Sequence, residues 1–447
     1  MSRRTPPPDH PMGALHLPLP ETATLSNGVS VWLLPDKRAP VVEFRLVLPT
    51  GGRAFDDPEW LGVAGATARL MTAGTPRRTS LQIADEAERY GGSLGFAANT
   101  ETATMYAHCL AAFTEPMLEL IADVLLNPAF PDNEIEIDRA NTLQRLALQR
   151  TQPDFLAEER FRQVLFGAHP YHYYAPNEEA VKRWNAEHLH RFYREHYCPQ
   201  GATLIVVGDF SPKRLLKHLE EQLGAWQGAL KQDKLPAPNT EPVETGFHLV
   251  PRPNSVQSVI HIGTLCPSRH SPDYWGLLVG VSVLGAGASS RLFLTVREQY
   301  GYAYSVGAHL DYYRRISAFV ASAQTATENT FDAIRQIRAE IDRLLNEPVP
   351  PEELQAVRNY LIGRHMLSWV TLGSIANLFM QIAIHGLPMD YWHQYPEQVR
   401  TVSRESVQEA CARYLRAERM SIVVVGEESL RRNLEATEDS DASEQEG

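Results

Sequence analysis

The sequence contains TLIVVGDFSPKRLLKHLEE at residues 203–221 and SIVVVGEESLRRNLEA at residues 421–436. Each stretch is a run of aliphatic residues that ends at a glycine, Gly208 or Gly426, and continues with residues that favour a helix. A strand leading into a helix is therefore predicted near the end of each half of the chain. The repetition indicates an internal duplication.

Two further pairs of stretches occur in the same order at nearly the same offset. The first pair is VWLLPDKRAPVVEFRLVL at 31–48 and FHLVPRPNSVQSVIHIGTL at 247–265. The second pair is DPEWLGVAGATARLM at 57–71 and SPDYWGLLVGVSVLG at 271–285. Three matches in one order indicate that the chain is two copies of one structural unit.

The order of elements within a half predicts the fold class. In the first half, hydrophobic alternation, helical periodicity and stop signals predict strands at 29–35, 41–49, 92–98, 102–110 and 202–208, and helices at 60–73, 79–90, 113–126, 133–150, 154–167 and 178–197. Strands and helices do not alternate as they do in a parallel sheet. Each half is therefore predicted to be α+β, an antiparallel-rich sheet covered by helices.

Composition sets the domain boundaries. The proline-bearing polar segment predicts an extended linker, and the acidic C-terminus has too few apolar residues to fold. The predicted order is a disordered N-terminus (1–21), an N-terminal domain (22–226), a linker (227–246), a C-terminal domain (247–434) and a disordered tail (435–447).

Charge and composition limit the partners. The formal net charge is -12, which argues against nucleic acid and anionic membrane as partners. The four cysteines are far apart in the sequence, so neither a disulfide framework nor a thiolate metal site is indicated. We see no apolar run typical of a secretory signal and therefore expect a cytoplasmic protein, or a periplasmic one if the start is mis-assigned.

Several local stretches resemble the pitrilysin/insulinase family of zinc peptidases, over about residues 22–432. The resemblance is carried by GVAGATARLMTAGT (62–75), LLNPAFPDNEIEIDRANTLQRL (125–146), HPYHYYAPNEEAVKRW (169–184) and SSRLFLTVREQYGYAYSV (289–306). It implies two homologous domains with a mitochondrial processing peptidase-like metallohydrolase fold.

In that family the first helix carries H-x-x-E-H. Two histidines at i and i+4 share a helix face and bind one zinc, and the glutamate acts as general base on the zinc-bound water. A glutamate on a later helix is the third ligand. Here Arg145 aligns with that glutamate, in the run 138–145, and the separation from the first motif is within the family's range. The five positions of the first motif are occupied by Gly65, Ala66, Thr67, Ala68 and Arg69.

The vacated ligand positions Gly65, Ala68, Arg69 and Arg145 therefore predict that this chain holds no catalytic zinc, since arginine offers only donors. Two hypotheses explain the arginines. Arg69 and Arg145 either bind a carboxylate, such as a peptide terminus or an acidic side chain of a partner, or are solvated surface charges.

Histidines elsewhere give only weak metal-site signals. The stretch HLHRFYREH places His188, His190 and His196 in one helical pattern, but positions 188 and 190 point to different faces. His169 lies in an HPY-type segment and is expected to pack.

A second family signature is present. Arg297 and Tyr304 have the spacing of an arginine and a tyrosine that, in the family, hold substrate and stabilise the oxyanion from the C-terminal half. Tyr302 is a rival for the tyrosine role, because strand alternation would put residues 302 and 304 on one face. The glycine-rich stretch 285–290 is either a site of close backbone approach or a plain turn.

The resemblance leaves three functional hypotheses. In the first, the chain is the non-catalytic subunit of a heterodimeric zinc metalloendopeptidase. It is inactive alone, holds no cofactor of its own, and lends Arg297 and Tyr304 to the zinc site of a homologous H-x-x-E-H subunit that cleaves peptides. In the second, it is an inert scaffold or peptide-binding protein like the core subunits of respiratory complexes. The third, an independent peptidase of other chemistry, lacks a G-x-S-x-G motif to support it.

Overall fold

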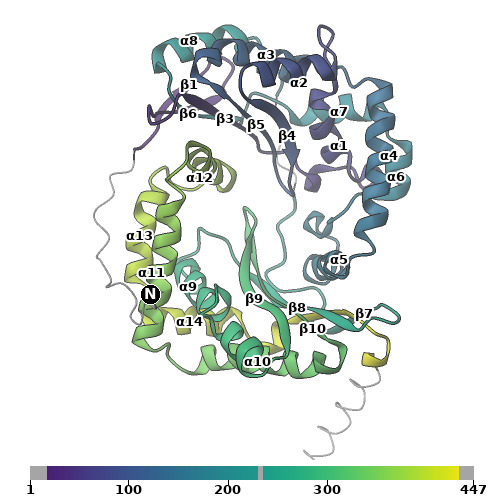
Figure 1. Ribbon diagram of the computed structural model, residues 1–447, viewed down its shortest axis with the longest axis vertical. Coiled ribbons are helices and arrows are strands. Elements are labelled where there is room, and N and C mark those ends of the chain that lie inside the picture. The colour runs from purple at the N-terminus through teal and green to yellow at the C-terminus, as the bar shows by residue number, and fades with distance from the viewer. Residues whose placement is uncertain (1–17, 230–234, 432–447) are drawn as a thin grey trace, which may run out of the picture.

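The computed structural model describes residues 18–229 and 235–431, which form two similar halves that face one another (Figure 1). The expected disordered tail lies outside these residues, as do residues 1–17 of the expected disordered N-terminus and 230–234 of the expected linker. Each half is a mostly antiparallel sheet covered by helices. This confirms the predicted α+β fold with two homologous domains.

The first sheet has six strands in the order β1-β2-β6-β3-β5-β4. Its neighbours are antiparallel except β2 and β6, which are parallel. β6 is aliphatic along its length because both faces of the sheet are covered there. The strands are β1 (Glu21–Thr24), β2 (Ser30–Pro35), β3 (Val41–Leu48), β4 (Ser93–Ala98), β5 (Ala103–Leu110) and β6 (Thr203–Gly208).

The helices of the first half are α1 (Val63–Leu70), α2 (Ser80–Arg89), α3 (Thr114–Leu126), α4 (Asp132–Gln149), α5 (Pro153–Phe166), α6 (Glu178–Arg183), α7 (Ala186–His196) and α8 (Pro212–Leu223). The prediction of one helix over 178–197 was wrong, because two non-helical residues separate α6 from α7. Trp184 is buried in an extended conformation, and the Asn185 side chain accepts the N–H of His188, which starts a new helix. The short edge strand β1 was not predicted.

The second sheet repeats the first without an equivalent of β1. Its order is β7-β11-β8-β10-β9, and β7 and β11 form its parallel pair, as β2 and β6 do in the first sheet. The strands are β7 (Gly246–Pro251), β8 (Gln257–Pro267), β9 (Ala303–Tyr312), β10 (Ile316–Ala326) and β11 (Ser421–Gly426). The helices are α9 (Tyr274–Gly285), α10 (Thr330–Asn346), α11 (Pro351–Leu367), α12 (Leu372–His385), α13 (Tyr391–Thr401) and α14 (Arg404–Tyr414).

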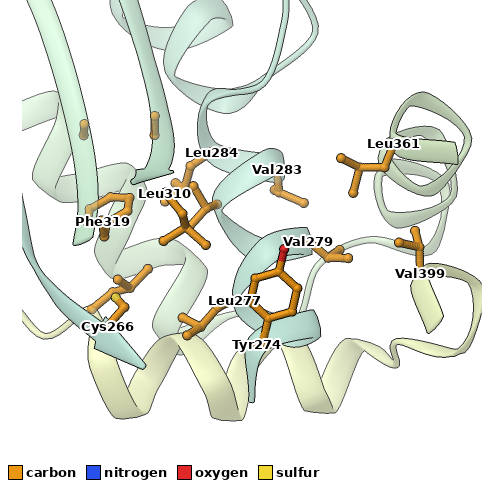
Figure 2. Packing of buried hydrophobic residues seen from close by; sticks show 14 of the residues in the cluster. Cys266, Tyr274, Leu277, Val279, Val283, Leu284, Leu310, Phe319, Leu361 and Val399 are labelled. Atoms are coloured by element: carbon orange, nitrogen blue, oxygen red, sulfur yellow. The ribbon is translucent and has the colours of Figure 1, made fainter. Parts of the chain in front are cut away.

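α9 fills the core of the second half. It is apolar on all sides because it lies between the sheet and other helices. Figure 2 shows side chains of α9 between strand residues such as Phe319 and helix residues such as Leu361. Gly280 permits close packing of α14, since a Cβ at this position would lie 2.3 Å from the Sγ atom of Cys411.

Each half packs one of its helices on the sheet of the other half. α5 of the first half packs on β8 and β11, and α12 of the second half packs on β3 and β6 (Figure 1). At the first contact Phe161 lies against Gly263, and at the second Arg45 donates from Nε to Asn377 Oδ1 at 3.0 Å. α5 and α12 occupy equivalent places in the duplication, so the exchange is reciprocal. Separating the halves would expose apolar surface on both sheets.

The turn between β9 and β10 makes a third contact with the first half. The buried carboxylate of Glu101 accepts the hydroxyl of Tyr171 at 2.5 Å and the backbone N–H of Arg314 at 2.9 Å. This contact fixes the tip of β9 relative to the first sheet.

Within the described residues, no single helix has the length and apolar composition to cross a membrane. The pair α11 and α12 passes that test only when combined, and it is bent by 112°.

Candidate functional site

The first candidate site lies at α1, whose start is fixed by Asp56. The Asp56 carboxylate accepts the backbone N–H of Gly62 at 2.6 Å and that of Ala64 at 2.7 Å. Gly62 has a φ of 102°, and a Cβ there would lie 2.4 Å from Pro176. Burial raises the pKa of Asp56 to about 7, although the two backbone N–H groups oppose the shift.

The aligned ligand positions converge in the structure. Arg69 lies one turn after Gly65, and a Cβ on Gly65 would be 3.2 Å from Nη1 of Arg69. Arg69 and Arg145 both donate from Nη2 to the hydroxyl of Thr142, at 3.2 Å and 3.1 Å. α1 and α4 therefore bring together residues that are far apart in the sequence. Ala68 is buried beneath them.

Arg69 has an ion-pair partner that the sequence did not reveal. Its Nε and Nη2 atoms donate to both oxygens of Asp138, at 2.7 Å and 2.9 Å. Arg69 is a surface charge that a bidentate pair with Asp138 holds in one place, and neither hypothesis for the arginines is decided by this pair. Arg145 is exposed, and the described residues give it no acidic partner.

These side chains do not fit the zinc ion that the family's motif would hold. The guanidinium of Arg69 occupies the space beside Gly65, and arginine cannot donate a lone pair to a metal. Among residues 18–229 and 235–431, no three His, Cys, Asp or Glu side chains are grouped so that they could hold a metal ion. The positions aligned with the family's metal ligands therefore form a cationic site, in which Arg69 and Arg145 meet at Thr142.

A cavity of about 270 Å³ lies beside these arginines, and first-half residues alone line it. Arg53, Arg69 and Arg145 contribute its charge, whereas Leu146 and Phe155 contribute apolar surface. Sequence reasoning missed Arg53, which begins a short 3₁₀-helical turn and belongs to no motif. Its contribution depends on contacts with distant residues, since its side chain donates to Tyr174 and Thr100.

The second candidate site begins with a π-helical turn, Phe293–Gln299. Within it, Arg297 lies 4.7 Å from the ring centroid of Phe293 and 3.7 Å from the carboxylate of its neighbour Glu298. The side chain of Arg297 is 42% exposed. π-Helical turns are often found at functional sites, and this one leaves the guanidinium open to solvent.

Tyr304 lies at an irregularity in β9. Ser305 pairs with Gln324 and Ala303 pairs with Thr325, so Tyr304 is the extra residue of a β-bulge. Its side chain is 79% exposed, and the described residues offer it no hydrogen bond. A bulge redirects a side chain away from the regular alternation of a strand.

Tyr302 occupies a different environment. It precedes β9, is partly buried against the second core, and stacks on Tyr300 with ring centroids 5.4 Å apart. The expectation that residues 302 and 304 share one strand face was therefore wrong, because the strand begins between them and the bulge follows. Of the two tyrosines, the structure leaves only Tyr304 open to solvent.

The remaining candidates have local structural roles. His188 lies tilted on Trp60 with ring centroids 3.7 Å apart, and His190 lies edge-on to Phe130 at 4.9 Å, so these two histidines have different neighbours. His196 packs against Phe55 and Phe192 and lines the same cavity as His188. His169 is buried and accepts the N–H of Tyr171, as expected for a packing residue. In the glycine-rich stretch, a Cβ on Gly285 would lie 1.8 Å from the backbone nitrogen of Ala308, so the close approach is to β9 of the same chain.

The fold and these two sites define a class: a duplicated metallopeptidase-like protein whose first half has lost the metal ligands. Two family models match the chain and together cover most of it. The model described as "Insulinase (Peptidase family M16)" matches residues 31–173, and the model described as "Peptidase M16 inactive domain" matches residues 183–361. The chain belongs to the insulinase family, peptidase family M16.

Curated relatives are named as zinc proteases. The chain is 27% identical to an uncharacterized zinc protease of Mycobacterium leprae over 68% of each protein. It is 26% identical to one of Mycobacterium bovis, over 83% of this chain and 85% of the relative.

Solved structures share the fold. A peptidase M16 inactive domain from Pseudomonas fluorescens matches with a TM-score of 0.86 and 23% identity, covering 91% of this chain and 98% of that one. A protease from Helicobacter pylori matches with a TM-score of 0.83 and 17% identity, covering 92% and 100%. A chain of complex III from Candida albicans matches with a TM-score of 0.77 and 14% identity, covering 91% and 95%.

Proposed function

We propose that this chain is the non-catalytic subunit of a heterodimeric zinc metalloendopeptidase and that it supplies Arg297 and Tyr304 to the active site of its partner. The observation that carries the proposal is the placement of Tyr304. A β-bulge leaves this tyrosine 79% exposed, and it makes no hydrogen bond with the described residues. Its hydroxyl is therefore free to donate to a bound molecule.

Arg297 supports the same proposal. Among the described residues its guanidinium contacts only Phe293 and Glu298, both in its own turn, so it can also donate to a bound molecule. A guanidinium and a phenol are fixed donors that can stabilise the negative charge that develops on a peptide carbonyl. A homologous subunit with an intact H-x-x-E-H motif would hold the zinc, which would activate water there. The two homologous domains would form part of the chamber that encloses the peptide.

The test is hydrolysis of a quenched fluorescent peptide library by this chain, by a homologous H-x-x-E-H protein of the same cell, and by the mixture with zinc. Activity is expected only in the mixture. Arg297→Ala or Tyr304→Phe should lower it by about 100-fold or more, the usual effect of losing one oxyanion donor. Tyr300→Phe is the matched control, because Tyr300 is exposed but stacks on Tyr302, and it should leave activity unchanged.

Tyr302→Phe tests whether Tyr302, rather than Tyr304, supplies the hydroxyl, and this variant should also leave activity unchanged. Loss of activity in that variant alone would transfer the role from Tyr304 to Tyr302. Zinc-dependent activity of this chain without a partner would contradict the whole proposal.

The second candidate function is an inert scaffold or peptide-binding subunit. Its support is the similarity of the fold to a chain of complex III. Stable association with the zinc-bearing homologue without any gain in hydrolysis would favour it.

A further inference from the structure

The cavity beside α1 has an unbalanced charge. Of its charged lining residues, Arg53, Arg69 and Arg145 are all cationic, and no aspartate or glutamate lines it. Only Arg69 has an acidic partner among the described residues, because Asp138 binds both of its nitrogens. Arg145 has no acidic partner among the described residues, and Arg53 forms no ion pair there, although the nearby carboxyl of Asp56 offsets part of its charge.

Arg53 is the most constrained of the three. It donates to the carbonyl oxygen of Tyr174 at 2.9 Å and to the hydroxyl of Thr100 at 3.1 Å, and its Nε atom is buried without a partner among the described residues. Burial lowers the pKa of Arg53, and the nearby charge of Arg162 adds to this effect. Because Arg53 is half-buried and forms no ion pair among the described residues, an anionic ligand would compensate its charge.

Arg145 is the most available of the three. It is exposed, and its one hydrogen bond goes to the hydroxyl of Thr142, which also accepts from Arg69. Thr142 thus holds two guanidinium groups close together at the edge of the cavity. Paired guanidinium groups suit the planar geometry of a carboxylate.

The rest of the lining combines polar residues, such as Thr142 and Gln149, with apolar ones. Leu146, Phe155 and Pro176 face a space of about 270 Å³, which suits a ligand with a carboxylate at one end and an aliphatic group at the other. A C-terminal residue of a peptide has these two features. An aspartate or glutamate within a chain has the carboxylate but brings further polar backbone with it.

We propose that this cavity binds the C-terminal carboxylate of a peptide that ends in an aliphatic residue, with Arg145 and Arg53 as its principal cationic partners. The cavity is lined by first-half residues only, so binding requires neither Arg297 nor Tyr304. The site that holds the metal in the family would then bind the C-terminus of a peptide in this protein.

The test measures fluorescence anisotropy of three labelled peptides titrated with the purified full-length chain. The first is Gly-Ala-Ala-Leu with a free carboxylate, the second is the same peptide with a C-terminal amide, and the third carries an internal Asp and a C-terminal amide. We expect the free acid to bind at least tenfold more tightly than either amide, which corresponds to about 1.4 kcal/mol. Added salt should weaken its binding.

Arg145→Gln should remove this preference, and it should not affect folding because the side chain is exposed. Arg150→Gln is the matched control. Arg150 follows the last residue of α4, pairs with Glu178 and does not line the cavity, so this variant should bind like the wild type.

Equal binding of the acid and its amide, or unchanged binding by Arg145→Gln, would overturn the proposal. Equal binding of the free acid and the internal aspartate peptide would overturn the assignment to a chain end. No partner subunit is present in the assay, so its result does not depend on the proposed peptidase function.

Discussion

The carboxylate of Asp56 governs how α1 begins, and Asp56→Asn tests this role. The native carboxylate accepts two backbone N–H groups, from Gly62 and Ala64, in a fully buried setting. Asparagine of the same size can accept only one of them, because its amide nitrogen is a donor. At pH 5 the free energy of unfolding of the variant should therefore be lower than that of the wild type by roughly 1–3 kcal/mol, the usual effect of leaving a buried donor unpaired.

The pH dependence should separate the variant from the wild type. Burial raises the pKa of Asp56 from its ordinary value of 3.8 to about 7 in the folded protein. Between these values the folded state binds more protons than the unfolded state, so this carboxyl lowers stability as pH rises. Between about pH 5 and about pH 8, proton linkage at Asp56 should lower the free energy of unfolding of the wild type by roughly 2.6 kcal/mol. Asparagine does not titrate and should show no such loss.

The assay is urea unfolding of both proteins at pH 5, 6, 7 and 8, followed by far-UV circular dichroism. Buried His365 and His385 have lowered pKa values, of about 4 and about 3, and they destabilise the protein as pH falls. Their effect cancels when the wild type is subtracted from the variant. The stability of the variant relative to the wild type should rise by roughly 2–3 kcal/mol across this range. A difference that stays constant from pH 5 to pH 8 would refute the raised pKa of Asp56.

Three further predictions concern the same region and the core. Gly62→Ala should destabilise the protein by at least about 2 kcal/mol in thermal unfolding, because φ is positive and the new Cβ would meet Pro176. An unchanged stability would contradict the close packing of Gly62 against Pro176. The triple variant Gly65→His, Arg69→His and Arg145→Glu should bind one zinc ion, because these three positions converge. Calorimetry should give a Kd of about 1 µM or tighter. A folded variant that binds no zinc would count against the alignment. The native protein should resist thiol reagents until it unfolds, because all four cysteines are buried, namely Cys109, Cys198, Cys266 and Cys411. Rapid labelling of the folded protein would contradict this burial.

Local patterns were enough to predict the architecture. The aliphatic runs before Gly208 and Gly426 predicted equivalent strands, which are β6 and β11. These predictions succeeded because strand alternation, helical periodicity and glycine stops depend on neighbouring residues. The replacement of the zinc ligands was also visible, since a motif with fixed spacing can be compared position by position.

Long-range contacts account for what the sequence did not reveal. Asp138 holds Arg69 only because α1 and α4 pack together, and Arg53 reaches the same cavity from a short 3₁₀-helical turn before α1. Tyr304 is distinguished from Tyr302 by a bulge, which depends on how β9 pairs with β10. The exchange of α5 and α12 between the halves likewise depends on contacts between distant segments. Such features arise from packing between segments far apart in the chain, and no local pattern of residues encodes them.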